Sequence, residues 1–438
     1  MPSLKVISGE GAGQREKMIL AGLNVTNRQK SGSSTNIYES MKELEELAVA
    51  AGGEVLGSIV QNKDSYDAAY YIGKGKAEEI KAYAENLGAD IVVFNEELSG
   101  AQIRNLEELI GVSVIDRTAL ILDIFAGRAL SKEGKLQVEL AQHKYRLPRL
   151  TGEGIAMSRT GGGIGTRGPG EKKLETDKRH IRERINDIRR ELKEISKNRE
   201  IQRSQRLKSN LPIIALVGYT NAGKSTIMNE LIKTHRDYSE DKAVFAKDML
   251  FATLDVSLRK AVLPCKQEYL ITDTVGFVSE LPHDLIEAFK ATLEEVRFAD
   301  ALVHVVDASN EHLQLQIETT LSVLRELGVE DKPMLYVFNK ADKVSYELEY
   351  KPKDPFVFIS AATGYNMEIF VGMIEKMILS RRKKVELKIP YTKGEIVSLL
   401  HQKYHFEEEY REDGAYFEVD LDEVDYGRYH EYIAGKEQ

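Results

Sequence analysis

Hydrophobic residues alternate between helical and strand spacing along much of this chain. In the first third, helical stretches precede short β-branched runs, and the first helix carries Met41, Leu44, Leu47 and Ala48 at helical spacing. Strands are expected at residues 54–60, 90–94 and 112–115, and residues 4–7 and 18–25 have the composition of two further short strands. Strands that alternate with helices of this length form βα units. The pattern predicts a separate α/β domain with a small, mostly parallel sheet over residues 1–130.

A second α/β region covers residues 210–380. Its expected strands are the apolar runs at residues 213–217, 260–263, 269–273, 301–307, 334–339 and 356–360. A basic linker follows at residues 381–384. Beyond it, a strand, a helix and a late strand are expected at residues 385–390, 394–402 and 416–421. These elements predict a small α+β domain over residues 381–438, so the chain as a whole is of the α/β class.

Residues 131–209 follow a different pattern. Leu136, Leu140 and Leu147 share one side of a helical stretch, and a glycine-rich loop follows at residues 161–170. After the loop, apolar residues recur mostly at spacings of three and four, as in a coiled-coil seam: Leu174, Ile181, Ile185, Ile188, Leu192 and Ile195. We predict an antiparallel helical hairpin with the glycine-rich loop at its tip.

Composition narrows the possible classes of protein. A chain of 438 residues with 42% hydrophobic and 30% charged residues is expected to form several ordinary soluble domains. The single Cys265 excludes an internal disulfide framework and favours a reducing cytoplasm. No run of about 18 apolar residues indicates a membrane span, and the first residues lack the apolar core of a signal peptide. We expect a cytoplasmic protein, with a monomer as the default state.

The net charge of −9 argues against a wholly basic nucleic-acid-binding protein, but the charge is unevenly distributed. The second arm of the hairpin, residues 178–208, carries twelve Lys and Arg against five Asp and Glu. Such a run can be no more than a solvated helix face. Beside a tip that contains Arg167 and many glycines, in an otherwise acidic chain, it favours binding to RNA phosphates.

A phosphate-binding motif follows the first strand of the second α/β region. Gly218 and the Gly223-Lys224-Ser225 triplet form the pattern G-x-x-x-x-G-K-S between an expected strand and an expected helix. Backbone N–H groups of such a loop enclose the α- and β-phosphates, the lysine contacts the β- and γ-phosphates, and the serine ligates Mg²⁺. The alternative is a glycine-rich turn that matches by chance.

Three further motifs follow in the order expected of a GTP-binding domain. Thr253 is the expected switch ligand of the γ-phosphate and Mg²⁺, Asp273 would hold Mg²⁺ through water, and the Gly276 N–H would contact the γ-phosphate. In the motif at residues 339–342, Asp342 would accept two N–H bonds from guanine. Adenine would leave that carboxylate unpaired, so the motif selects GTP over ATP.

These motifs define the predicted site. The catalytic residues are Lys224, Thr253, Gly276 and Asn221, and the Mg²⁺ ligands are Ser225, Thr253 and Asp273. The residues expected to bind GTP or GDP are Gly218, Tyr219, Thr220, Asn221, Ala222, Gly223, Lys224, Ser225, Thr226, Phe251, Ala252, Thr253, Leu254, Asp255, Asp273, Thr274, Val275, Gly276, Asn339, Lys340, Ala341, Asp342, Ser360, Ala361 and Ala362.

One expected catalytic residue is missing. In small signalling GTPases a glutamine directly after the Asp-x-x-Gly motif orients the attacking water, and here that position is Phe277. We therefore expect slow intrinsic hydrolysis. In GTPases that this chain resembles, an asparagine at the position of Asn221 coordinates K⁺. The alternative is that Asn221 only shapes the loop.

Gly73-Lys74-Gly75 also precedes an expected helix, but it lacks the G-K-[ST] ending. We interpret it as a tight turn into that helix, with a second nucleotide site as the alternative.

Taken together, the segments GYTNAGKST, FATLD, DTVGF and NKAD resemble the HflX family of translational GTPases, as do YIGKGKAEEI, GGGIGTRGPGEKKLETD and IPYTKGEIVSLLH outside the nucleotide motifs. The resemblance extends from about residue 15 to 425, but residues 150–159 lack the aromatic-containing segment expected there. It implies a GTPase that binds the large ribosomal subunit through the N-terminal domain and hairpin, and splits or rescues stalled or idle ribosomes under stress. Two alternatives remain: a GTPase that acts on another RNA or regulatory partner, and a GTP-switched binding module with negligible turnover.

Overall fold

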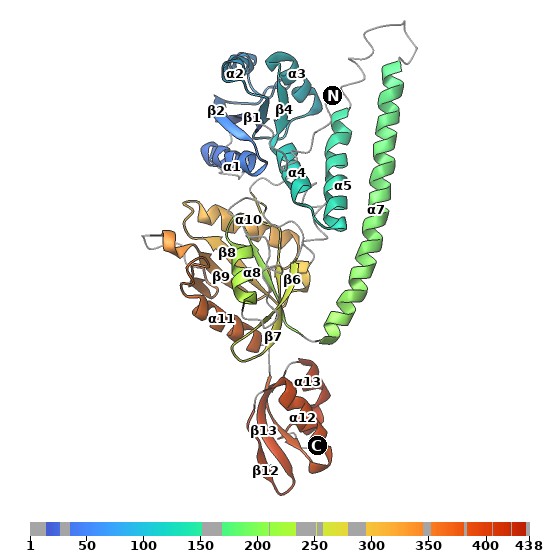
Figure 1. Cartoon of the computed structure of the whole chain (residues 1–438), viewed down its shortest axis with the longest axis vertical. Coiled ribbons are helices and arrows are strands. Elements are labelled where there is room, and N and C mark those ends of the chain that lie inside the picture. Colours follow the sequence, from blue (N-terminus) through green and yellow to red (C-terminus); the bar gives the residue numbers. More distant parts are fainter. Residues whose placement is uncertain are drawn as a thin grey trace.

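The computed structural model describes residues 15–26, 36–150, 169–209, 211–233, 251, 257–278, 295–344, 352–380, 383–404, 406–421 and 423–434. Two α/β units and a smaller α+β unit follow one another along the long axis of the molecule, and a long helical hairpin runs beside the upper two (Figure 1). Among the described residues, no helix is both long enough and apolar enough to cross a membrane.

The N-terminal unit contains a four-stranded parallel sheet in the order β2-β1-β3-β4. Its elements are β1 (Lys17–Val25), α1 (Ile37–Ala50), β2 (Glu54–Lys63), α2 (Lys74–Leu87), β3 (Ile91–Phe94), α3 (Gly100–Ile110), β4 (Ser113–Asp116) and α4 (Arg117–Arg128). Alternate residues of β1 enter two different cores: Ile19 packs with α2 and α3, whereas Leu20 packs with α1 and α4. The predicted small parallel sheet is confirmed, but the sequence analysis did not predict α4.

Helices α5 (Lys132–Arg149) and α7 (Pro169–Ser209) form the two arms of the hairpin (Figure 1). The predicted seam is present, because Ile185 and Ile188 of α7 pack against Leu136 and Leu140 of α5. At the foot of the hairpin, the Arg199 guanidinium of α7 lies 2.5 Å from the Glu133 carboxylate of α5. The glycine-rich tip lies outside the described residues.

The middle unit contains a six-stranded sheet in the order β10-β9-β8-β5-β7-β6, in which only β6 runs antiparallel to its neighbour. Its elements are β5 (Ile213–Gly218), α8 (Lys224–Ile232), β6 (Ser257–Val262), β7 (Glu268–Asp273), β8 (Ala301–Asp307), α10 (Leu313–Glu326), β9 (Met334–Asn339), the 3₁₀ turn η4 (Ala341–Lys343), β10 (Phe356–Phe358) and α11 (Met367–Leu379). Because β5, β7, β8 and β9 are parallel, their carboxyl ends meet at one edge of the sheet.

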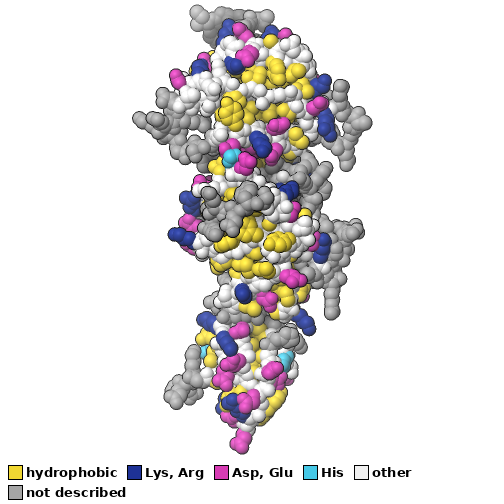
Figure 2. All heavy atoms as spheres, turned by 90° about the vertical axis from the view of Figure 1, so that its left-hand side faces the viewer, with side chains coloured by type: hydrophobic (Ala, Val, Ile, Leu, Met, Phe, Trp, Pro, Cys, Tyr) yellow, Lys and Arg dark blue, Asp and Glu magenta, His cyan; other side chains and the backbone are white. Residues whose placement is uncertain are grey.

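The C-terminal unit pairs β11 (Lys383–Ile389), β13 (Gly414–Leu421) and β12 (Glu409–Arg411) in an antiparallel sheet, with β13 in the centre. Helices α12 (Gly394–Lys403) and α13 (Glu423–Arg428) accompany this sheet, as the α+β prediction required. Figure 2 shows many acidic side chains on the visible face of this unit.

The hairpin seam gives a first prediction. Ile188 is fully buried between the two arms. Ile188→Ala should weaken the pairing of the arms by about 2–5 kcal/mol, because it removes buried methyl groups and leaves a cavity. Since a protein of several domains rarely unfolds in one step, the measurement is amide hydrogen exchange, which should become faster in both α5 and α7. Asn186→Ala, on the exposed side of α7, is the control. Equal exchange in the two variants would contradict a seam that depends on Ile188.

Candidate nucleotide-binding site

The phosphate loop begins where β5 ends, and two glycines allow its path. Gly218 has φ = 145°, and a Cβ there would lie 2.1 Å from the Val305 carbonyl oxygen. Gly223 has φ = 94°, and its Cβ would lie 2.2 Å from the Asn339 side-chain nitrogen. A side chain at either position would strain the backbone, because φ is positive there, and would clash with these atoms. The loop then enters α8 at Lys224, as the motif predicts.

Lys224 is a buried cation among carbonyl groups. It is 6% exposed, and its Nζ donates to the Gly218 oxygen at 2.9 Å and the Tyr219 oxygen at 2.7 Å. Burial lowers the pKa of Lys224 to about 8, although the Asp273 carboxylate raises it. Burial and the Lys224 charge also lower the pKa of the neighbouring His304 to about 3, so this imidazole is neutral at pH 7. A phosphate group would supply the negative charge that a buried ammonium requires.

Two oxygen side chains suited to Mg²⁺ meet beside Lys224. The Ser225 hydroxyl donates to Asp273 Oδ2 at 2.6 Å, and Asp273 is fully buried at the end of β7. Mg²⁺ prefers hard oxygen ligands and is commonly held by one or two protein groups together with phosphate oxygens and water. The donor set therefore fits the ion. The third predicted ligand, Thr253, lies outside the described residues, together with Ala252, Leu254 and Asp255.

The segment after Asp273 lies directly against the phosphate loop. The Thr220 N–H donates to the Phe277 oxygen at 2.7 Å, and the Phe277 N–H donates to the Gly218 oxygen at 3.2 Å. A Cβ on Gly276 would lie 2.7 Å from Thr220 Cα and 3.0 Å from Lys224 Nζ, so only glycine fits there. The Thr274 hydroxyl donates to the Leu216 oxygen at 2.7 Å and anchors the segment to β5.

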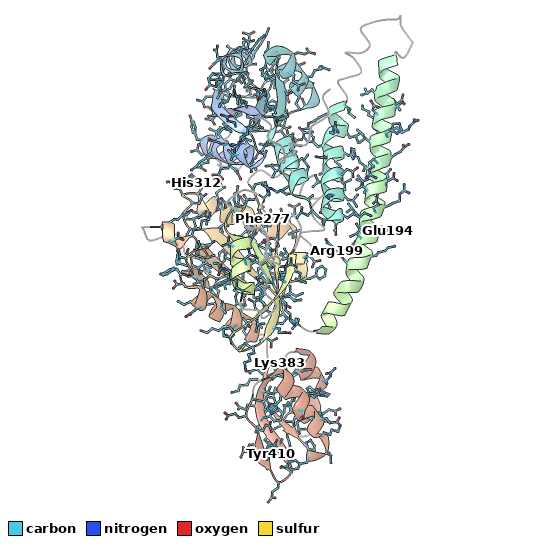
Figure 3. The ribbon with its side chains drawn as sticks, viewed as in Figure 1. Glu194, Arg199, Phe277, His312, Lys383 and Tyr410 are labelled. Carbon is cyan, nitrogen blue, oxygen red and sulfur yellow. The ribbon has the colours of Figure 1, made fainter. Side chains whose placement is uncertain are left out.

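The Phe277 ring points into the protein. It is 2% exposed and packs with Ala215, Val217 and Leu302 beneath the loop (Figure 3). In this arrangement its ring forms part of the core, and its aromatic side chain can neither donate nor accept the hydrogen bonds that orient water.

Asn339 joins the phosphate loop to the predicted base-binding loops. Its Nδ2 donates to the Ala222 oxygen at 2.9 Å, and its Oδ1 accepts from the Ala361 N–H at 3.0 Å. Lys340 follows with φ = 61°, and its ammonium lies 2.7 Å from the Asp307 carboxylate. Ser360 is buried, whereas Asp342 and Ala362 are exposed. The groups expected to read guanine therefore lie at one sheet edge with the phosphate loop.

The N-terminal unit reaches the same loop through a polar network that the sequence analysis did not find. The Tyr219 hydroxyl, within the phosphate loop, donates to the Glu43 carboxylate of α1. Glu43 in turn lies 2.5 Å from the Arg117 guanidinium, which is 3% exposed. Arg117 also donates to the Ser40 hydroxyl and to the Asn95 side-chain oxygen, both at 3.1 Å. The buried arginine is thus fixed on several sides. We call Tyr219, Glu43 and Arg117 the interdomain clasp.

Apolar contacts extend the clasp to the switch segments. Phe251, with φ = 53°, packs edge-on against Phe125 of α4 at a centroid distance of 4.5 Å. Val275 and Val278 join the same cluster as Phe125. Phe251 and the segment after Asp273 therefore share an apolar cluster with α4. A lone phenylalanine at residue 125 carries no signal in the sequence that could have identified this role.

A cleft of about 250 Å³ lies beside the clasp, between α1 and the start of α10. The His312 imidazole borders it and lies 3.2 Å from the Glu39 carboxylate across the two units (Figure 3). Figure 2 shows acidic and basic side chains and a histidine gathered at this junction. Polar contacts therefore border the apolar contact between the units.

Comparison with known proteins finds matches in each of the N-terminal, hairpin and nucleotide-binding regions. Family models for the N-terminal domain and the middle region of GTP-binding GTPases match residues 38–126 and 128–206, and a model described as a 50S ribosome-binding GTPase matches residues 213–340. A solved GDP complex of a GTP-binding protein from Sulfolobus solfataricus is 26% identical, covers 83% of this chain and 99% of its own, and has a TM-score of 0.44.

Two curated relatives are similar over most of their length. GTPase HflX of Caldanaerobacter subterraneus is 49% identical over 391 residues, which cover 89% of this chain and 87% of the relative. GTPase HflX of Escherichia coli K12 is 42% identical over 385 residues, which cover 86% and 88%. With these relatives and the phosphate-loop motif in its strand–loop–helix setting, the chain belongs to the HflX family of GTPases and is a GTP hydrolase.

Proposed function

We propose that this GTPase binds the large ribosomal subunit and uses GTP to split or rescue stalled or idle ribosomes under stress. The observation that carries the proposal is a basic helical arm, α7, that leads directly into a GTPase unit whose phosphate loop the N-terminal unit holds through the interdomain clasp. The printed description of the family model over residues 213–340, a 50S ribosome-binding GTPase, supports the same partner.

The basic arm presents a continuous stripe to solvent. Arg182, Arg189, Lys193 and Lys197 of α7 are exposed and are spaced by seven, four and four residues, which places them on one side of the helix. Ile185 and Ile188 are buried against α5, and the stripe lies beside this seam on the exposed part of α7. Other basic residues of α7, such as Arg184, pair with carboxylates of the hairpin. The four residues of the stripe are exposed cations suited to RNA phosphates.

In the proposed GTP complex, Lys224 contacts the β- and γ-phosphates, and the Gly276 N–H contacts the γ-phosphate. Ser225, Thr253 and Asp273 hold Mg²⁺, which would neutralise charge that develops on the phosphates. Asn221, which has φ = 59°, would hold K⁺ near the same oxygens. Asp342 selects guanine. These roles extend the geometry described above to a bound nucleotide.

The buried Phe277 ring makes a dependence on the ribosome the simplest account of activation. No group at that position can orient water, so an outside surface must order the switch segments. The clasp and the Phe125–Phe251 contact connect those segments to the N-terminal unit. A ribosome that moves the N-terminal unit would therefore act on the phosphate loop and on both switches at once.

The test of this function is GTP turnover by the full chain with and without purified 50S subunits in K⁺ buffer. We expect a rise of roughly a hundredfold, which corresponds to about 2.7 kcal/mol of activation free energy. Dissociation of 70S ribosomes, followed by light scattering, should require GTP. Slow turnover in both conditions would contradict activation by the 50S subunit and would favour another RNA or a protein as the activator. Equal turnover in KCl and NaCl would remove the role of K⁺.

The stripe on α7 should determine binding to the subunit. Arg189→Gln with Lys193→Gln should weaken 50S binding several-fold and flatten its dependence on salt, since fewer phosphates are neutralised. Arg325→Gln with Lys376→Gln changes the net charge equally at exposed positions of α10 and α11 and is the control. Co-sedimentation at several salt concentrations measures both effects. Equal losses in the two double variants would show that overall charge, and not the stripe, controls binding.

Base selection gives a separate prediction. Asp342→Asn replaces an acceptor with a group that also donates, so it should weaken GTP binding and shift preference toward xanthine nucleotides. Competition of GTP and XTP for the purified variant measures this shift. Asp354→Asn, at another exposed aspartate of the same unit, is the control. If Asp342→Asn kept its preference for guanine, the assignment of Asp342 to the base would be wrong.

A further inference from the structure

A second cavity lies in the N-terminal unit, away from the nucleotide site. Its volume is about 600 Å³, and Tyr66, Tyr71, Leu98, Gln102, Pro148 and Arg149 are among the residues that line it. A cavity of this size is within the range of small-molecule and cofactor sites. It opens where the carboxyl end of β3 meets the end of α5, as the positions of Leu98 and Arg149 show.

The loop between β2 and α2 forms one wall, and hydrogen bonds fix its shape. Asp67 accepts from the Ala69 and Tyr70 N–H groups at 2.8 and 3.0 Å, and Asp67 and Tyr71 exchange two backbone hydrogen bonds. The Gln102 side chain donates to the Asp67 oxygen at 3.2 Å. These bonds hold Tyr71 at φ = 66°, a conformation that is uncommon for a large aromatic residue. The wall is therefore prearranged before any ligand arrives.

This loop presents two tyrosines to the cavity. The Tyr66 and Tyr71 rings are nearly parallel, with an interplanar angle of 11° and a centroid distance of 6.0 Å. Tyr71 packs against the apolar core, whereas Tyr66 is 65% exposed. An aromatic side chain that is exposed at a cavity, above a ring anchored in the core, provides a surface for a flat aromatic ligand.

In the opposite wall, one arginine is paired with two carboxylates. Arg149 donates to the Glu97 carboxylate at 2.9 Å, to the Leu98 oxygen at 2.8 Å and to the buried Asp116 carboxylate at 3.2 Å. Its guanidinium also lies 3.5 Å from the centre of the Tyr145 ring. Because Arg149 is paired with two carboxylates, this wall has no excess positive charge that could bind a phosphate. The cavity favours an uncharged flat group, and a nucleobase has this character.

The position of the cavity favours RNA as the source of that base. Arg149 is the last residue of α5, and the glycine-rich tip follows it in the chain. The last turn of α5 thus lines the cavity, and the basic stripe lies on α7, which packs beside α5 (Figure 1). RNA that contacts the stripe through its phosphates can place an unpaired base on the tyrosines.

We propose that this cavity binds an unpaired RNA base, which stacks on Tyr66 beside Tyr71. The inference rests on the proposed function for its RNA partner, and it assigns the recognition of single-stranded rather than paired RNA to the N-terminal unit. Paired bases are stacked inside a duplex and cannot enter the cavity.

The experiment uses the full chain saturated with GDP, so that the nucleotide site cannot accept the probe. A single-stranded RNA octamer that contains one 2-aminopurine should lose fluorescence on binding, because the base stacks on Tyr66. Tyr66→Ala should remove this quenching and weaken binding about tenfold, and Tyr66→Phe should retain both. Tyr38→Ala, which removes an equally exposed tyrosine from α1, is the control and should bind as the parent chain does.

Three outcomes would overturn the proposal. Equal binding and quenching by Tyr66→Ala and the parent chain would exclude a stacked base at this site. Equal loss of binding to a duplex of the same sequence would show that Tyr66 does not select unpaired bases. Tyr66-dependent binding of free ATP, with no such dependence for the octamer, would make the ligand a mononucleotide. Since the probe is isolated RNA, none of these results depends on whether 50S subunits stimulate GTP turnover.

Discussion

The structure depends on one buried ion pair, Arg117 with Glu43. Arg117 is 3% exposed, and its charge could not remain there without Glu43 and the oxygens of Ser40 and Asn95. Removing one partner of such a pair typically costs about 3–5 kcal/mol, because the other charge stays buried without compensation. The pair also orients Glu43 toward the Tyr219 hydroxyl. The contact that stabilises the N-terminal unit is therefore the same one that positions it on the phosphate loop.

The phosphate loop is consequently held from two sides. Asn339 connects it to the base-binding loops within the GTPase unit, and the interdomain clasp connects it to the N-terminal unit. Phe251, Val275 and Val278 pack into the apolar core around α4, so the switch segments share this second attachment. Movement of one unit against the other would alter the packing of Phe251, Val275 and Val278. Under the proposed function, this interface is the route by which an external surface would act on a site in which Phe277 cannot orient water.

The sequence was sufficient to predict those parts of the structure that follow from motif spacing or from the period of a helix. The loop at Gly218 and Gly223, the meeting of Ser225 with Asp273 and the bracing role of Asn339 all follow from motif spacing on parallel strands, whose carboxyl ends must converge. The hairpin seam was also predictable, because Ile185 and Ile188 follow the period of packed helices. The roles of Thr253 and of the hairpin tip remain predictions, since both lie outside the described residues.

Long-range contacts were not predictable in the same way. Helix α4 buries residues on nearly all sides, so its apolar run has no amphipathic period to identify it. Tyr219 occupies a variable position of its motif, and its partner Glu43 lies 176 residues away in the chain. The Tyr66–Tyr71 pair likewise depends on a loop conformation that Gln102 and Asp67 determine. In each case the contact depends on which surfaces pack together in the folded protein. The spacing of residues along the chain does not predict this.

Two consecutive residues at the start of α4 connect the tyrosine-lined cavity with the interdomain clasp. Asp116, the N-cap of α4, accepts from Arg149 in the wall of the tyrosine-lined cavity and also from the Leu98 N–H. Arg117, the next residue, holds the clasp on the phosphate loop. A displacement of Arg149 would change the hydrogen bonds of a fully buried carboxylate, whose burial already raises its pKa. Asp116 caps the helix that Arg117 begins. Because one peptide bond joins the two residues, a movement of Asp116 would also move Arg117 in the clasp.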